Sequence, residues 1–212
     1  MDGISLFREM IRKLFHLSSI LIVVGYTFLL TYFSPRVAIL AMTALLLILL
    51  EVEYVRLEHR PRIAEAIEGF LRHHEKTRLS SAVFLVISCI ISFSAFDYWV
   101  AFMAVSMAVF GDLVAALLGK AFGETKFYGT KSVVGTLGGF LMNMIVGLLA
   151  VPHLFIVFAP MAITATFVEV FTKKMDDNLT IPLFSGFLGQ MIVMYFSLNL
   201  PPIEFTFLGL FN

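Results

Sequence analysis

The chain has 212 residues and no formal net charge at pH 7. Hydrophobic residues make up 59% of it and charged residues only 14%, and its mean hydropathy is +0.94. A soluble domain cannot bury that much apolar surface, so a soluble fold is excluded. The composition predicts an integral membrane protein, and we expect no nucleic-acid partner.

Seven apolar stretches have about the length that a helix needs to cross a bilayer. In chain order they cover residues 17–34, 36–50, 79–96, 98–118, 133–151, 153–170 and 182–200. The second stretch is short by itself and is expected to continue as a helix into Glu51 and beyond, while the sixth contains Pro160. We therefore predict an all-α, multi-pass bundle with about seven transmembrane helices, forming a single membrane domain over residues 1–212.

Basic residues are concentrated in segments that would lie on one side of such a bundle. With seven spans, the N-terminus and the connectors 51–78, 119–132 and 171–181 share one side, and they hold every Lys and Arg except Arg36. The positive-inside rule makes that side cytoplasmic, which places the C-terminus on the opposite side. Connector 51–78 has apolar residues at helical spacing between charges, which predicts a cytoplasmic amphipathic helix on the membrane surface.

Oxygen-bearing side chains gather just before the last apolar stretch. Asp176, Asp177 and Asn178 offer several hard ligands that suit Mg²⁺ or Ca²⁺. Glu169 lies seven residues before Asp176, close to two helical turns, and would point to the same side if its helix continued that far. A polar connector between two spans would also account for this run.

Asp112 lies inside the fourth apolar stretch. A carboxylate costs on the order of 2.5–3.5 kcal/mol at the bilayer centre, so it should face the bundle interior with a partner. Lys120 follows on the same side of the helix, at its end. Asp112 is therefore a candidate catalytic group, and a structural ion pair or a hydrogen-bonded buried acid is the alternative.

Small residues recur at four-residue intervals in two of the predicted spans. Gly111, Ala115 and Gly119 form one stripe, and Gly135 with Gly139 forms another. Such stripes let helices approach closely in lipid. Helix packing alone would explain them, and it would also bring the neighbouring polar groups together.

The connector from Gly119 to Ser132 contains three lysines and three glycines. Glycines let backbone N–H groups approach a phosphate, lysines supply charge, and the N-terminus of the following helix adds its positive dipole end. We predict a phosphate site that includes Lys120, Lys131 and Ser132. The connector is not a P-loop, because the G-x-x-x-x-G-K-[ST] spacing is absent. A solvated basic loop that obeys the positive-inside rule is the alternative.

A further basic cluster precedes the first apolar stretch. It consists of Arg12, Lys13 and His16, with Arg12 and His16 on one helix face. An anchor on the membrane surface is the alternative to a functional role. All of these clusters fall on the predicted cytoplasmic side, and together they are the parts that phosphoryl or nucleotidyl transfer requires.

In their order along the chain, these residues resemble the polyprenol kinase family, which includes dolichol kinases, phytol kinases and CTP-dependent diacylglycerol kinases. The resemblance covers about residues 8 to 190. Its motifs are Arg12-Lys13-x-x-His16, Gly111-Asp112-x-x-Ala115-Ala116-x-x-Gly119-Lys120-x-x-Gly123, Lys131-Ser132-x-x-Gly135, Glu169 and Asp176-Asp177-Asn178-x-x-Ile181-Pro182. Arg72 and Glu75 match another charged pair of the family loosely.

The resemblance implies an integral membrane kinase that transfers the γ-phosphate of CTP to a lipid alcohol. Asp112 and Asp177 would be the catalytic carboxylates. Asp176, Asp177 and Glu169 would hold Mg²⁺ or Ca²⁺. The CTP phosphates would be bound by Arg12, Lys13, His16, Lys120, Lys131, Ser132 and Asn178. The rivals are a CTP-dependent lipid cytidylyltransferase and a cation-coupled transporter. Neither the lipid nor the oligomeric state follows from the sequence.

Overall fold

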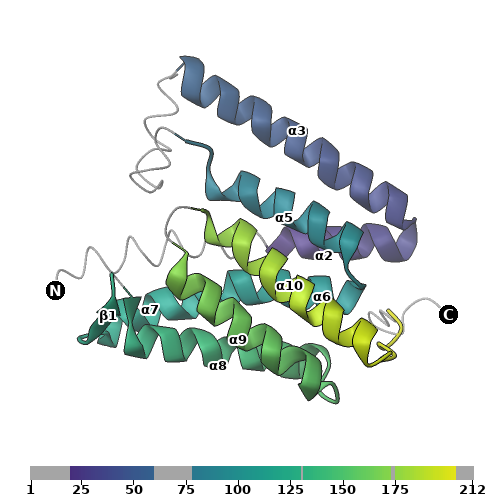
Figure 1. The fold of residues 1–212 in the computed structure, drawn as a ribbon. Coiled ribbons are helices and arrows are strands. Elements are labelled where there is room, and N and C mark those ends of the chain that lie inside the picture. Colours follow the sequence, from purple (N-terminus) through teal and green to yellow (C-terminus); the bar gives the residue numbers. More distant parts are fainter. Residues whose placement is uncertain (1–19, 60–77, 130, 173–174, 204–212) are drawn as a thin grey trace, which may run out of the picture.

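The computed structural model describes residues 20–59, 78–129, 131–172 and 175–203. Within these residues the chain is helical except for one short hairpin (Figure 1). The helices are α2 (Ile20–Tyr32), α3 (Pro35–His59), α5 (Ser81–Ala95), α6 (Tyr98–Ser106), α7 (Asp112–Phe122), α8 (Val133–Ala150), α9 (Phe155–Phe171) and α10 (Asp177–Tyr195). A π-helical turn, η2 (Met107–Gly111), joins α6 to α7, so that residues 98–122 form one continuous rod.

Each of the seven apolar stretches corresponds to a helix or, for residues 98–118, to this rod. Within the described residues, four helices are long and apolar enough to cross a membrane: Pro35–Glu58, Tyr98–Phe122, Val133–Ala150 and Asp177–Tyr195. The apolar helices α2, α5 and α9 are shorter, with 13, 15 and 17 residues. The prediction of an all-α helical membrane protein is therefore confirmed, while the number of spans stays a prediction.

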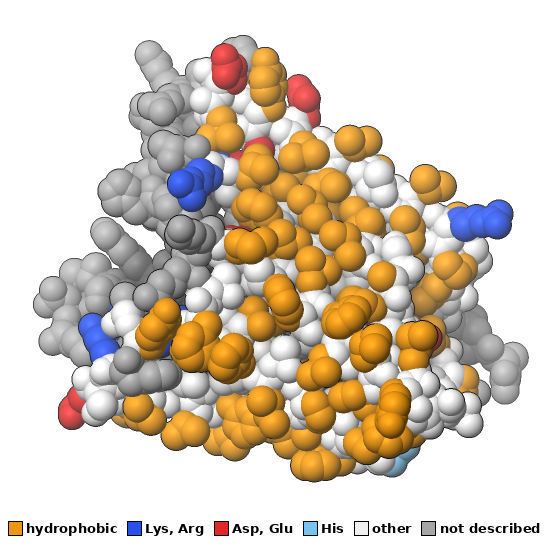
Figure 2. Space-filling model, in the orientation of Figure 1, with side chains coloured by type: hydrophobic (Ala, Val, Ile, Leu, Met, Phe, Trp, Pro, Cys, Tyr) orange, Lys and Arg blue, Asp and Glu red, His pale blue; other side chains and the backbone are white. Residues whose placement is uncertain are grey.

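The outer surface of the bundle is apolar. Many large hydrophobic side chains of the outer helices are exposed, among them Leu21, Leu47, Leu149 and Phe187. Figure 2 shows them as a broad orange field, with Lys, Arg, Asp and Glu mainly along its left edge. Soluble proteins rarely expose such a continuous apolar area, so this surface indicates contact with lipid.

Two apolar clusters fill the interior, and the rod belongs to both. One cluster joins α6, η2, α8, α9 and α10 around residues such as Met103 and Phe158. The other joins α2, α3, α5 and α6 around residues such as Tyr26 and Leu85. The helix ends gather at two opposite edges of the bundle (Figure 1). We call the edge with the hairpin and the first residue of α10 the hairpin end.

The last helix begins earlier than the apolar pattern predicts, at Asp177 instead of residue 182, and it ends at Tyr195 instead of 200. Asp176 caps it, because its Oδ1 accepts a hydrogen bond of 3.0 Å from the backbone N–H of Asn178. The Asp-Asp-Asn run is thus a helix N-terminus and not a polar connector. The preceding helix α9 ends at Phe171, so Glu169 and Asp176 do not lie on one continuous helix.

The glycine-rich connector forms a small antiparallel hairpin where a loop is predicted. Its strands are β1 (Lys126–Tyr128) and β2 (Lys131–Ser132), and Gly129 adopts a φ of 58° at the turn. In connector 51–78, residues 51–59 continue α3, which confirms the predicted extension past Glu51. The rest of the predicted amphipathic helix, with Arg72 and Glu75, lies outside the described residues.

The two stripes of small residues pack directly against each other. A Cβ atom added at Gly135 in α8 would lie 2.6 Å from the carbonyl oxygen of Ala115 and 2.9 Å from the Cα of Gly119. One turn along, a Cβ at Gly139 would lie 3.0 Å from the Cβ of Ala115. The predicted close approach of these two helices is therefore confirmed, and it leaves no room for a side chain at Gly135.

We predict that Gly135→Ala destabilises the protein by about 1–3 kcal/mol, because the new methyl group meets backbone atoms that cannot move aside cheaply. The measurement is the thermal unfolding midpoint in detergent. Gly25→Ala in α2 is the matched control, since a Cβ there would meet nothing within 4 Å. Alanine also favours a helix more than glycine does. A midpoint for Gly135→Ala at or above that of Gly25→Ala would contradict the close packing.

Candidate functional site

Acidic and basic groups from four elements meet near the hairpin end. The Nζ of Lys131, in β2, lies 2.8 Å from Oε1 of Glu169 in the last turn of α9. The charges of Asp177, the first residue of α10, and of Asp112, the first residue of α7, also act on Lys131. We call Asp112, Lys131, Glu169 and Asp177 the acid–lysine cluster.

Lys131 keeps its positive charge in this setting. Burial by itself would lower the pKa of its ammonium group, but the neighbouring Glu169, Asp177 and Asp112 outweigh that effect and raise the pKa above its ordinary value of 10.5. The side chain is therefore a permanent cation at neutral pH. Its ammonium group can donate to a phosphate oxygen, but one lysine does not balance three carboxylates, so a phosphate would need an additional cation beside it.

The glycine stripe makes room for the Glu169 carboxylate. Glu169 is only 2% exposed, and a Cβ added at Gly139 would lie 3.3 Å from its Oε2 atom. The same added atom would lie 3.3 Å from the carbonyl oxygen of Gly111, directly before Asp112. Close packing of α7, α8 and α9 therefore brings the two buried acids of the cluster to the same level of the bundle.

A second polar contact lies one helical turn farther from the hairpin end. The Nδ2 of Asn143, in α8, donates a 3.2 Å hydrogen bond to Oγ1 of Thr166 in α9. The Asn143 side chain is almost fully buried, and within the described residues its Oδ1 accepts no hydrogen bond. That oxygen lies against Gly111, where any Cβ would collide with it. Asn143 thus packs against the π-helical turn that precedes Asp112, and such turns are frequent at functional sites.

Sequence reasoning missed both Asn143 and the π-helical turn. An amide within a predicted span is a visible signal, because a polar side chain in the membrane needs a partner. The turn has no comparable signature, since its five residues, Met107–Gly111, are ordinary members of an apolar helix.

Ser132 caps the start of α8. Its Oγ accepts a 3.1 Å hydrogen bond from the backbone N–H of Gly135 and so caps α8. Gly119, Gly123 and Gly135 all approach this hydroxyl so closely that an added Cβ would press on it. These glycines therefore fit the hairpin onto the start of α8, which places Lys131 next to Glu169.

Asp176 and Asn178 lie beside the cluster at the start of α10. Both carboxylate oxygens of Asp176 accept hydrogen bonds, Oδ1 from the N–H of Asn178 and Oδ2 from the hydroxyl of Ser81 at 2.8 Å. Asn178 is buried, and its carbonyl lacks its usual helical donor because residue 182 is a proline without an N–H. The start of α10 is therefore held by Asp176, which places Asp177 in the first helical turn.

Lys120 is separated from Asp112 by the length of α7. Eight residues at a rise of 1.5 Å place the two about 12 Å apart along the helix axis. Lys120 is in the last turn, where a cation is favoured by the helix dipole. The remaining predicted phosphate ligands, Arg12, Lys13 and His16, lie outside the described residues.

The carboxylates near Lys131 could bind a metal ion only together with other ligands, such as phosphate oxygens. In the part of the chain that the structure describes, they do not form a site in which protein side chains supply all the ligands. Within the described ranges, no three His, Cys, Asp or Glu side chains are grouped closely enough to hold an ion by themselves. Glu169, Asp176 and Asp177 are therefore not a complete ligand set. Mg²⁺ in nucleotide sites is usually bound by one or two carboxylates, with phosphate oxygens and water as the other ligands. The hard oxygens of Asp177 and its neighbours fit that pattern.

Fold and site together define a helical membrane protein with a charged cluster at one end of its bundle. Comparisons of the chain with family profiles, with characterised proteins and with solved structures find no match.

The Lys131–Glu169 pair should be strongly coupled. Lys131→Met leaves Glu169 buried without its cation, and Glu169→Gln leaves Lys131 partly buried without its closest acid. We expect each single variant to unfold at a lower temperature than the wild type. The double variant should lose less stability than the two losses combined, with a coupling energy of about 0.5–3 kcal/mol. Additive losses in a double-mutant cycle would show that the two side chains do not interact.

Proposed function

We propose that the protein is a CTP-dependent lipid kinase, which transfers the γ-phosphate of CTP to the hydroxyl group of a membrane lipid alcohol. The candidate lipids are polyprenols such as dolichol, phytol or geranylgeraniol, and diacylglycerol. The choice of CTP and a lipid alcohol is supported by the order of the motifs, which resembles the polyprenol kinase family. The observation in the structure that supports it is the Lys131–Glu169 ion pair near one end of an apolar bundle, with Asp112 and Asp177 near enough for their charges to act on Lys131. A lipid alcohol can reach such a site from the bilayer and a nucleotide from the water phase.

The nucleotide phosphates are bound by cations and by helix N-termini in this scheme. Lys131 interacts with the phosphate oxygens while Glu169 holds its side chain in place. The starts of α8, at Ser132, and of α10, at Asn178, add the positive ends of two helix dipoles, which favour an anion. Lys120 contributes charge from the end of α7. Phosphoryl transfer depends mostly on this kind of positioning and charge neutralisation.

The divalent ion of the scheme is Mg²⁺, with Ca²⁺ as the alternative. Asp177 and Glu169 would hold it, and Asp176 would contribute through a lone pair that its two hydrogen bonds do not use. When bound, the ion neutralises charge on the phosphates. The ordered start of α10 keeps the Asp177 carboxylate close to Lys131, so that both act on the same phosphate group.

Asp112 is our first choice for the group that receives the proton of the lipid hydroxyl. It is 7% exposed, it lies next to the lipid-embedded part of the bundle, and Lys131 lies close enough for their charges to interact. In the reaction, the lipid oxygen bonds to the γ-phosphorus and the bond from that phosphorus to the β-phosphate oxygen breaks. CDP leaves, and the hydroxyl proton moves to a carboxylate oxygen of Asp112. Asp177 is the alternative base.

The proposed orientation has all seven apolar helical segments crossing the membrane, with the N-terminus and the site in the cytoplasm and the C-terminus on the other side. The distribution of charge supports this orientation. Within the described residues, Arg36 lies in the first turn of α3 at the edge opposite the hairpin, and every other Lys and Arg lies at the hairpin end. These residues are Arg56, Arg78, Lys120, Lys126 and Lys131.

The test is to incubate the purified protein with Mg²⁺, CTP labelled at the γ-phosphate, and a panel of dolichol, phytol, geranylgeraniol and diacylglycerol. We expect the label to appear in one lipid, with CDP as the second product. Asp112→Asn should reduce the rate by roughly 10²–10⁴-fold, as expected for loss of a general base. Glu124→Gln, which changes an exposed acid at the hairpin end, is the matched control and should keep the wild-type rate.

One result would overturn the kinase assignment, and another would overturn the role of Asp112. If a lipid phosphate is added to the panel, labelled pyrophosphate together with a CDP-linked lipid would identify a cytidylyltransferase instead of a kinase. A near-normal rate for Asp112→Asn would remove Asp112 from the mechanism and leave Asp177 as the base.

A further inference from the structure

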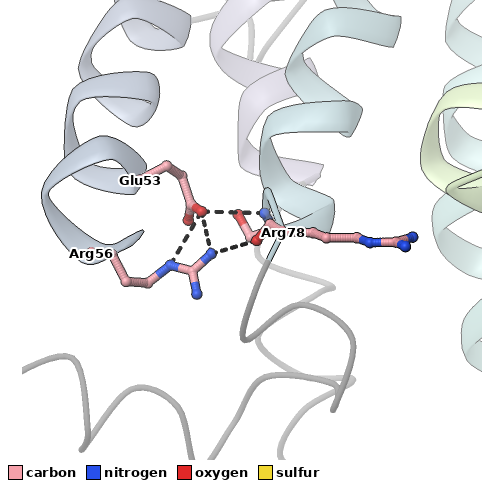
Figure 3. A network of polar contacts seen from close by, with 4 residues as sticks. Glu53, Arg56 and Arg78 are labelled. Atoms are coloured by element: carbon pink, nitrogen blue, oxygen red, sulfur yellow. Dashed lines mark hydrogen bonds and ion pairs between the residues drawn. The ribbon is translucent and has the colours of Figure 1, made fainter. Parts of the chain in front are cut away.

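A buried ion pair connects the end of α3 to the residues that lead into α5 (Figure 3). The guanidinium group of Arg56 donates to Oε2 of Glu53 through Nε, at 3.2 Å, and through Nη2. The same carboxylate oxygen accepts a 3.3 Å hydrogen bond from the backbone N–H of Ser80. The Nη2 atom of Arg56 also donates to the carbonyl oxygen of Arg78, at 2.7 Å.

Stability alone is a weak explanation for this pair. Glu53 and Arg56 are only 7% and 6% exposed, and removing two charges from water offsets much of their attraction. Apolar side chains of similar size often serve stability as well or better at such places. The pair does what apolar side chains cannot do, because it makes directed hydrogen bonds to the backbone of Arg78 and Ser80. It therefore fixes the position of the start of α5.

Ser81, the residue after Ser80, connects α5 to α10. Ser81, the first residue of α5, donates its hydroxyl hydrogen to Oδ2 of Asp176 at 2.8 Å. The other oxygen of Asp176 caps α10 by accepting from Asn178. Two consecutive residues thus have different tasks: Ser80 is held by α3 through its backbone, and Ser81 holds α10 through its side chain.

We propose that Glu53, Arg56 and Ser81 are positioning residues for the acid–lysine cluster. Through Asp176 they fix the first turn of α10 and therefore the place of Asp177 relative to Lys131. The kinetic part of this inference rests on the proposed function, because its effect is read as a rate of phosphate transfer. A displacement of about 1 Å at a reacting centre can cost roughly 10²-fold in rate, so a single hydroxyl can matter.

The test compares two neighbouring serines. Ser81→Ala removes the hydroxyl that bonds to Asp176. Ser80→Ala keeps the backbone N–H that bonds to Glu53 and removes a side chain that makes no capping hydrogen bond, which makes it the matched control. We expect kcat/KM for CTP to fall about tenfold or more in Ser81→Ala and to be unchanged in Ser80→Ala. Ser81→Thr, which keeps the hydroxyl, should restore it, and KM for the lipid should stay constant throughout.

Hydrogen–deuterium exchange gives a second measurement that does not depend on the enzymatic activity. Amides of the first turn of α10, residues 177–181, should exchange about tenfold faster in Ser81→Ala than in the wild type. Glu53→Gln should speed exchange at the starts of both α5 and α10, because it weakens the link before Ser80 and Ser81. Ser80→Ala should leave both segments as they are in the wild type.

The two measurements separate the possible failures. Faster exchange in Ser81→Ala, together with a wild type that transfers no phosphate to any lipid, would refute the proposed kinase and leave the positioning of α10 intact. Equal exchange in Ser81→Ala and Ser80→Ala would overturn the positioning role. A lower unfolding temperature for Ser81→Ala with unchanged kcat/KM would also overturn it, because the link would then serve stability alone.

Discussion

The ion pair between Lys131 and Glu169 is the interaction on which the site depends. It joins a hairpin to the end of α9 at a distance of 2.8 Å, and it stands at the boundary between the apolar bundle and the charged hairpin end. The Glu169 charge would not be tolerated in such a place alone, since an unpaired buried charge is costly. The Glu169 carboxylate lies against Gly139, and the same glycine approaches Ala115 and Gly111, so a larger residue there would crowd both contacts. The close packing of the small residues and the placement of the Glu169 carboxylate therefore depend on the same glycine.

The scaffold holds the helices of this site at both ends. At the edge opposite the hairpin, Gln190 of α10 and Asp97 before α6 exchange two hydrogen bonds, from Nε2 to Oδ2 at 2.9 Å and from the Asp97 N–H to Oε1 at 2.8 Å. At the hairpin end, the Asp176–Ser81 hydrogen bond ties α10 to α5. With both ends of α10 fixed, its first turn can hold Asp177 in one place while the outer faces of the bundle meet lipid.

Apolar runs in the sequence predict the helices well, because a helix that crosses a bilayer must be apolar along most of its length. The boundaries near the site are predicted less well. Hydropathy cannot show that Asp176 caps a helix, so α10 is placed five residues too late, at residue 182 instead of Asp177. The hairpin and the π-helical turn are also missed, because the first depends on how the glycines pack around Ser132 and the second on packing against Asn143.

The candidate site is predicted as a set of residues but not as a set of contacts. Asp112, Lys131, Glu169 and Asp177 are all visible in the sequence as charges in or beside apolar stretches. The structure pairs Lys131 with Glu169 and leaves Asp112 and Asp177 near enough for their charges to act on Lys131. The pairing of Lys131 with Glu169 is not visible, since 38 residues separate them and only the tertiary fold makes the contact. The hydrogen bonds of Asp176 are hidden in the same way, because Ser81 is distant in sequence.

The most direct test of the central claim is the affinity of the protein for Mg²⁺–CTP, measured by equilibrium binding on folded, monodisperse samples. Lys131→Met should weaken binding about tenfold or more, a loss of about 1.4 kcal/mol per factor of ten, because the cation that faces the phosphates is gone. Lys126→Met, which removes an exposed lysine from the same hairpin, should bind nearly as the wild type does. Equal affinities for the wild type and Lys131→Met would contradict a nucleotide site at the acid–lysine cluster.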